Sequence, residues 1–112
     1  MHEKDLNILV LFDFYGDSLK AHQKNIIDLY YNHDHSLSEI AEEVGITRQG
    51  VRDTLKRGEQ TLCALEQQLG LAARFRRAKE QLEQITDALR EIPTDQPEKI
   101  AAIIDALQAL EL

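Results

Sequence analysis

The stretch SLSEIAEEVGITRQGVRDTLKR, residues 36–57, decides the fold of this chain. Ser36 precedes Glu39 by three residues, which is the spacing of a capping box. In that arrangement the hydroxyl and the carboxylate each accept a hydrogen bond from a backbone N–H at the start of a helix. Apolar residues then recur at three- and four-residue steps until Gly45, which favours the left-handed conformation that ends a helix. We therefore predict a short helix that starts at Leu37.

A second helix is predicted directly after this turn. Thr47 is placed to cap it, and Val51 and Leu55 are spaced to face the core. Ala41 is small enough for the two helices to cross closely, Gly45 makes the turn, and Val51 fills the space between the helices. A small residue, a glycine and a β-branched residue at these distances are typical of a helix-turn-helix. The alternative is an ordinary helical hairpin.

The outer side of the second helix is basic. Residues 48–57 carry four cations and the single anion Asp53, whereas the whole chain has a net charge of -7. That overall charge argues against a protein that coats nucleic acid, but a local excess of cations can direct one face toward phosphate or an acidic partner. The residues predicted to bind nucleic acid are Thr47, Arg48, Gln49, Arg52, Lys56 and Arg57. In the hairpin alternative these side chains only face solvent.

Length and composition predict one all-α domain. The chain has 112 residues, 43% of them hydrophobic, with only two prolines and five glycines. This is enough apolar material for a modest core. We expect a single domain over residues 1–112, with a helix-turn-helix core at 19–57 and a helical tail at 58–112 that dimerises.

The sequence predicts a cytoplasmic protein. It has no apolar run of about 18 residues that would span a membrane, and its start, MHEKDLN, lacks the layout of a secretory signal. The single cysteine, Cys63, is suited to a reducing compartment and is expected to be a small core residue. We do not expect the protein to bind a membrane.

Two further helices are predicted before the motif, at residues 3–15 and 19–32. The aromatic residues of FDFYG (12–16) and of positions 30–31 are expected to pack as core, rather than to stack on bases. Lys20, His22 and Lys24 either contact a phosphate backbone or face water. The segment HDH, residues 33–35, is interpreted as a turn rather than a metal site, because three adjacent ligands cannot surround one ion.

The helical pattern continues after the motif, with Gly58 as its weak point. Leucines recur up to Gly70, and a heptad seam follows at Leu71, Phe75, Ala78, Leu82, Ile85, Leu89 and Ile92. A last amphipathic helix is expected after Pro97. The seam must be covered, either by folding back at Gly70 or by another chain. We predict a homodimer with an interface at Leu62, Leu69, Phe75, Leu82, Ile85 and Leu89.

Taken together, these features resemble a known family. FDFYG, its spacing to Tyr30 and Tyr31, the stretch 36–57 and the long helical tail are similar to the YlxM-like proteins, small bacterial proteins encoded beside the signal recognition particle GTPase. The resemblance covers roughly the whole chain. It implies an all-α fold with a helix-turn-helix like that of sigma-70 region 4, and a regulatory role in the signal recognition particle pathway. Gly50 and Arg52 depart from the family pattern, which has alanine and an aromatic residue there.

Two functions remain open. In the first, the protein binds double-stranded DNA: Arg48, Gln49 and Arg52 reach base edges, and Lys56 and Arg57 hold the backbone. In the second, the motif is a scaffold and the partner is the signal recognition particle GTPase or its RNA, contacted through the acidic face of the tail at Glu80, Glu83, Asp87 and Glu91. The sequence contains no nucleophile with a paired base, no glycine-rich phosphate-binding loop and no residues with the spacing of metal ligands. We therefore expect that the protein is not an enzyme and that it binds no cofactor and no metal.

Overall fold

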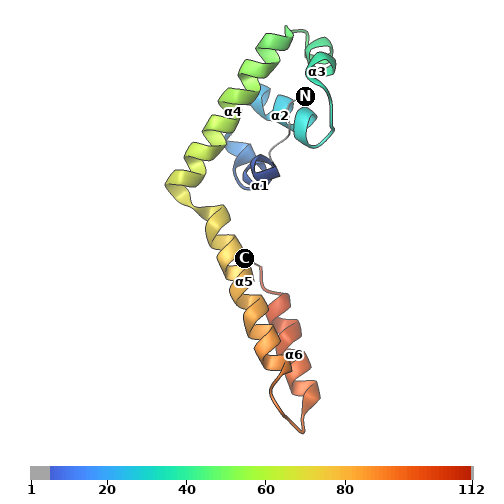
Figure 1. Ribbon diagram of the computed structural model, residues 1–112, viewed down its shortest axis with the longest axis vertical. Helices are drawn as coiled ribbons and strands as arrows, with labels where there is room; N and C mark the ends of the chain where they lie inside the picture. The colour runs from blue at the N-terminus through green and yellow to red at the C-terminus, as the bar shows by residue number, and fades with distance from the viewer. Residues whose placement is uncertain (1–5, 112) are drawn as a thin grey trace. The chain divides into compact units, whose positions relative to one another are not determined.

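The computed structural model describes residues 6–111 (Figure 1), and every regular element in that range is helical, as predicted. The elements are α1 (Leu6–Tyr15), the short 3-10 helix η1 (Gly16–Ser18), α2 (Ala21–Tyr31), α3 (Leu37–Val44), α4 (Arg48–Leu69), α5 (Leu71–Arg90) and α6 (Pro97–Gln108). Within the described residues, none of these helices combines the length and the apolar character needed to cross a membrane.

The chain divides into two compact units, Met1–Ala72 and Ala73–Leu112. We expected one domain whose core ended at residue 57. Instead, α4 runs on as a core element up to Leu69, so the border between the units falls 15 residues later than the predicted start of the tail. We predicted a first helix at residues 3–15. Its first three residues, 3–5, lie outside the described residues.

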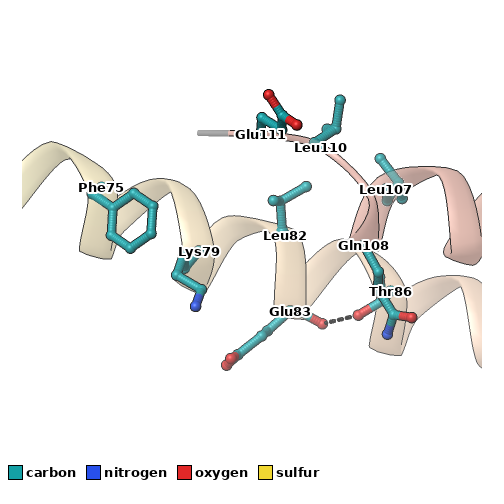
Figure 2. Close-up of a pocket in the computed structure, with 9 residues that line it drawn as sticks. All are labelled: Phe75, Lys79, Leu82, Glu83, Thr86, Leu107, Gln108, Leu110 and Glu111. Atoms are coloured by element: carbon teal, nitrogen blue, oxygen red, sulfur yellow. Dashed lines mark hydrogen bonds between the residues drawn. The ribbon is translucent and has the colours of Figure 1, made fainter.

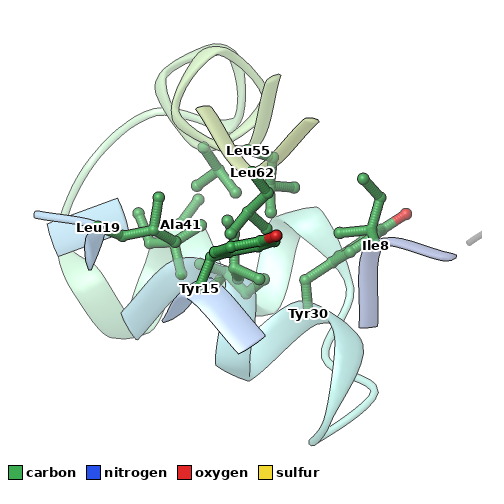
Figure 3. Packing of buried hydrophobic residues seen from close by; sticks show 11 residues of the cluster. Ile8, Tyr15, Leu19, Tyr30, Ala41, Leu55 and Leu62 are labelled. Carbon is green, nitrogen blue, oxygen red and sulfur yellow. The ribbon is translucent and has the colours of Figure 1, made fainter. Parts of the chain in front are cut away.

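In the first unit, α1, α2 and α3 all pack against α4. The side chains that these helices bury form one cluster (Figure 3). Five of them are fully buried and contribute most to the core. They are Ile26, Ile27, Ile40, Val51 and Leu62. Burying a side chain of this size contributes about 1.5 to 3 kcal/mol, so this cluster supplies most of the stability of the unit.

The predicted start and end signals of the motif are confirmed. The Glu39 N–H donates to Ser36 Oγ and the Ser36 N–H donates to Glu39 Oε1, both at 3.1 Å, which completes the capping box. Gly45 ends α3 in the left-handed conformation with φ 80°. Thr47 Oγ1 then accepts a hydrogen bond from the Gly50 N–H at 2.9 Å and starts α4. Local hydrogen bonds therefore set the turn between α3 and α4.

Gly58, which we expected to weaken the helix, lies where α2 crosses α4. It is buried, and a Cβ atom at this position would lie 2.4 Å from Ile27 Cδ1. No real Cβ makes such a contact, so a side chain here would have to displace the end of the Ile27 side chain at the crossing of the two helices. The glycine costs about 1 kcal/mol in helix propensity but permits the close packing of the core.

Tyr15 bonds to residues at the end of α4 and directly after it. Its hydroxyl donates to Glu66 Oε1 at 2.6 Å and accepts a hydrogen bond from the Leu71 N–H at 3.0 Å. The same carboxylate oxygen of Glu66 accepts from the Ala72 N–H at 3.0 Å. Burial and the nearby carboxylate of Glu66 raise the pKa of the Tyr15 phenol. These bonds satisfy N–H groups that the first turn of α5 would otherwise leave without partners.

Two expectations about buried residues need correction. Cys63 is exposed rather than part of the core, because it follows the inward-facing Leu62 and the helix turns it about 100° away. Among the aromatic residues, Tyr15 and Tyr30 are buried as predicted, but Phe14 is exposed. Composition indicated that these residues would be buried, whereas their position around the helix decides the outcome.

The HDH segment forms the turn that leads to α3. Asp34 takes a left-handed conformation with φ 56°. His33 Nε2 lies 3.3 Å from Asp28 Oδ2, and His35 Nδ1 lies 3.3 Å from Glu43 Oε2 without the geometry of a hydrogen bond. Across residues 6–111, no group of three His, Cys, Asp or Glu side chains is placed to hold a metal ion.

The second unit is a hairpin of α5 and α6 (Figure 1). Phe75 and Leu82 of α5 line a groove of about 570 Å³ together with Leu107 of α6 and with Leu110, which follows that helix (Figure 2). Among the described residues of this unit, only Thr86 and Ile104 are buried. The seam therefore has a neighbour that we did not anticipate, since α6 covers part of it.

Candidate nucleic-acid interface

The six residues predicted to bind nucleic acid lie at the start of α4. Thr47 is its N-cap, and the other five belong to its first ten residues. All six are exposed, because the neighbouring Val51 and Leu55 face the core and the helical period turns the rest toward solvent. The structure therefore presents every predicted contact residue on the surface of the motif.

The four cations of this set do not form one strip. Arg52 and Lys56 line a hollow on one flank of α4, together with Leu37 of α3 and Tyr30 of α2. Arg57 lies on the other flank, in a second hollow. Gln49 points between the two flanks, about half a turn away from the buried Val51. A ligand that contacts all of them must therefore surround much of the exposed surface of the helix, as a DNA major groove does.

None of the cations on this part of α4 is neutralised within the described chain. Arg48, Arg52, Lys56 and Arg57 form no ion pair with any carboxylate of residues 6–111. Elsewhere such pairs do form: Lys24 Nζ lies 2.5 Å from Asp17 Oδ1, for example. The side chains at the start of α4 can therefore contact a phosphate without first losing an internal partner.

Two carboxylates reduce the positive potential of this surface. Gln49 Nε2 donates to Asp53 Oδ1 at 2.9 Å. The Tyr31 hydroxyl donates to Glu59 Oε1 at 2.7 Å, and Glu59 lines the same hollow as Arg52. If Gln49 is to bind an adenine with both ends of its amide, its bond to Asp53 must break.

Lys20 joins the site from a distant part of the sequence. It lines the hollow beside Arg57, together with Gln23 of α2. His22 and Lys24, which the sequence also offered for contact with a phosphate backbone, have internal partners. His22 Nε2 lies 3.5 Å from Thr54 Oγ1. Lys24 donates a hydrogen bond to Asp17 and lowers the pKa of that carboxyl. Only the fold brings Lys20 next to Arg57, because no local sequence pattern connects them.

The residues predicted for a dimer interface are not equivalent. Leu62 is fully buried in the core of the first unit, so its assignment to the interface is wrong. Phe75, Leu82 and Leu89 are partly buried and line grooves shared with α6. Leu69 and Ile85 remain exposed. The heptad pattern identified an apolar stripe correctly but did not distinguish internal contacts from a free surface.

Comparison with known proteins identifies the family. Residues 2–103 match the UPF0122 family, described as "Putative helix-turn-helix protein, YlxM / p13 like". A UPF0122 protein of Halalkalibacterium halodurans is 40% identical over 111 residues, covering 99% of this chain and 100% of the relative. A UPF0122 protein of Bacillus licheniformis is 42% identical over 109 residues, which cover 97% of each chain. A UPF0122 protein of Desulforamulus reducens is 48% identical over 82 residues, which cover 73% of this chain and 70% of the relative. The chain therefore belongs to the UPF0122 family of YlxM-like helix-turn-helix proteins.

Proposed function

We propose that this protein is a DNA-binding regulator that acts in the cytoplasm without catalysing a reaction. The observation that carries the proposal is the start of α4, where four cations face solvent and none of them pairs with a carboxylate of residues 6–111, although the chain is acidic overall. Cations arranged in this way on the second helix of a helix-turn-helix are suited to a DNA groove.

The proposed roles follow from the position of each side chain. Arg48, Gln49 and Arg52 read base edges in the major groove, because they lie nearest the N-terminus of α4, the end that enters the groove in this motif. Lys56 and Arg57 contact the phosphate backbone. Lys20 extends the contact of Arg57 along the same strand, since the two residues line one hollow.

We also propose that the protein acts as a homodimer, which presents two such helices to DNA. The resemblance to the YlxM-like proteins favours a regulatory role in the signal recognition particle pathway. DNA binding could serve that role through the expression of its components.

A second candidate function is an adaptor that binds the signal recognition particle GTPase or its RNA. It is favoured by the exposed carboxylates of Glu80, Glu83 and Asp87 on α5 and of Glu91 directly after it, which would suit a basic protein surface. One of them is already engaged, because Arg90 Nη1 lies 3.1 Å from Asp87 Oδ1. Exposed carboxylates on a helix are also common without any partner, so we rank this function second.

The experiment is a selection of genomic DNA fragments by the purified protein, followed by measurement of affinity for the best fragment. Arg52→Ala is expected to weaken binding by about 1 to 3 kcal/mol and to relax the sequence preference. Arg90→Ala is the control, because Arg90 is an exposed arginine outside the motif.

A parallel capture from cell lysate, with and without nuclease, separates the two candidates. If DNA binding is the function, the captured material is DNA and is lost in the Arg52→Ala variant. Capture of the GTPase or its RNA, unchanged by Arg52→Ala and with no genomic fragment selected at low salt, would replace this proposal by the adaptor.

A further inference from the structure

Asp53 is the single anion among residues 48–57, and the proposed roles of its cationic neighbours leave it unexplained. Lys56 and Arg57 follow it by three and four residues, the spacings at which opposite charges pair along a helix. Asp53 nevertheless forms no ion pair with a cation of residues 6–111. Its partner is a neutral side chain, because Asp53 Oδ1 accepts a hydrogen bond from Gln49 Nε2 at 2.9 Å. The carboxylate is exposed and is therefore open to a ligand.

Asp53 lies in the middle of the outward side of α4. Each residue of an α-helix is turned about 100° from the one before, so Asp53 lies about 200° around the helix from the buried Val51. Lys56 is turned about 60° from Asp53 in one direction, and Arg57 about 40° in the other. Lys56 and Arg57 are the proposed phosphate contacts. The side chain between them therefore faces the base edges of the groove.

The bond to Gln49 leaves one carboxylate oxygen for such a contact. Asp53 Oδ2 has no hydrogen bond within residues 6–111, and a carboxylate can only accept hydrogen bonds. In the major groove, hydrogen bonds are donated only by the N4 amino group of cytosine and the N6 amino group of adenine. Adenine places its acceptor N7 beside N6, where it would repel a carboxylate. Cytosine is therefore the base that suits this position best.

We propose that Asp53 selects a cytosine in the DNA site, with Oδ2 accepting a hydrogen bond from the N4 amino group. This inference rests on the proposed DNA binding and adds a sequence preference to it. The negative charge of Asp53 weakens the attraction to phosphates at every sequence, whereas the contact with cytosine offsets that cost at one base pair only. Asp53 thus opposes binding wherever another base stands there.

The test is selection from a randomised duplex pool by the wild type, Asp53→Asn and Asp53→Ala. The selection identifies the base pair whose preference depends on residue 53, and affinity is then measured on four duplexes that differ only there. The wild type is expected to bind the cytosine duplex about tenfold more tightly than the other three. Asp53→Asn is expected to prefer adenine, because an amide accepts from N6 and donates to N7. Asp53→Ala is expected to lose the preference at this base pair.

Glu59→Gln is the matched control. Glu59 is another carboxylate of α4, and it accepts a hydrogen bond from the Tyr31 hydroxyl at 2.7 Å. Glutamine keeps an acceptor for that bond but removes one negative charge. The variant is therefore expected to strengthen binding to all four duplexes by the same factor and to keep the preference for cytosine. An Asp53 that is merely solvated would give this uniform result too.

The possible outcomes separate this inference from the proposed function. A wild type that binds no duplex at low salt would overturn both. Three results would overturn the role of Asp53 and leave DNA binding standing. The first is a wild type that binds duplexes without sequence preference, and the second is a preference that depends on residue 53 but is for a base other than cytosine. The third is a wild-type preference that Asp53→Asn and Asp53→Ala both retain.

Discussion

Single residues define the helix-turn-helix. Glu39 is one of them: it accepts the Ser36 N–H through its carboxylate, and this bond, together with the Ser36 hydroxyl, lowers the pKa of the Glu39 carboxyl. Gly45 ends α3 because its φ of 80° is a conformation that other residues rarely adopt. These features depend on neighbours within a few residues, and for that reason the sequence alone predicted them.

The lowered pKa of Glu39 gives a prediction about pH. A carboxyl whose pKa is lower in the folded state adds stability above its unfolded pKa of about 4.3, and this contribution is lost as the pH falls through the folded-state pKa. Glu39→Gln keeps a side chain that can accept the bond but removes the titration. We expect denaturant unfolding to show the wild type losing stability relative to Glu39→Gln as the pH falls below about 4.3.

Glu42→Gln is the control for this prediction, because Glu42 is an exposed carboxylate on the same helix. It should change the dependence of stability on pH much less than Glu39→Gln. Equal behaviour of the two variants would show that the capping box does not hold the carboxylate in solution.

The helices depend on close crossings that no local pattern reveals. From the sequence, Gly58 could be judged only by helix propensity, which counts it as a weakness. In the structure it allows α2 and α4 to approach, because the space for its Cβ is occupied by Ile27. The same limit explains the seam: a heptad repeat indicates that a stripe must be covered, but not whether α6 or another chain covers it.

Gly58→Val should therefore lower the free energy of unfolding, although helix propensity alone would favour valine over glycine. Inserting a branched side chain at this crossing overpacks the core, and we expect a loss of about 2 to 3 kcal/mol in the free energy of unfolding. Gln60→Val is the matched control on the exposed side of the same helix, where about 0.5 kcal/mol or less is expected. Denaturant unfolding of both variants measures the difference, and similar losses would contradict the close crossing of α2 and α4.

At the scale of the whole molecule, the core is distributed unevenly. Eleven buried hydrophobic residues form the cluster of the first unit, whereas the described part of the second unit buries Thr86 and Ile104. The sequence indicated enough apolar residues for one domain, but it did not show that most would gather around α4. Nor did it show that Lys20 and Arg57 line one hollow, since that requires the packing of α2 on α4.

This distribution predicts that residues 1–72 fold on their own. The fragment keeps the whole cluster around α4 and the hydrogen bonds of Tyr15, so it should unfold cooperatively at a temperature independent of protein concentration. Leu62→Ala in this fragment should cost about 2 to 5 kcal/mol, because it leaves a cavity in the core. Circular dichroism during heating checks both points, and a fragment without a cooperative transition would contradict the division into units.

The central claim, that the exposed start of α4 binds DNA phosphates and bases, is tested most directly by the salt dependence of binding to duplex DNA. A plot of log Kd against log salt concentration should be steep for the wild type and lose about one unit of slope in Lys56→Ala and again in Arg57→Ala, because each variant releases one fewer counterion. Arg90→Ala should leave the slope unchanged. An affinity that does not respond to salt, or a slope that stays the same in all three variants, would contradict the account.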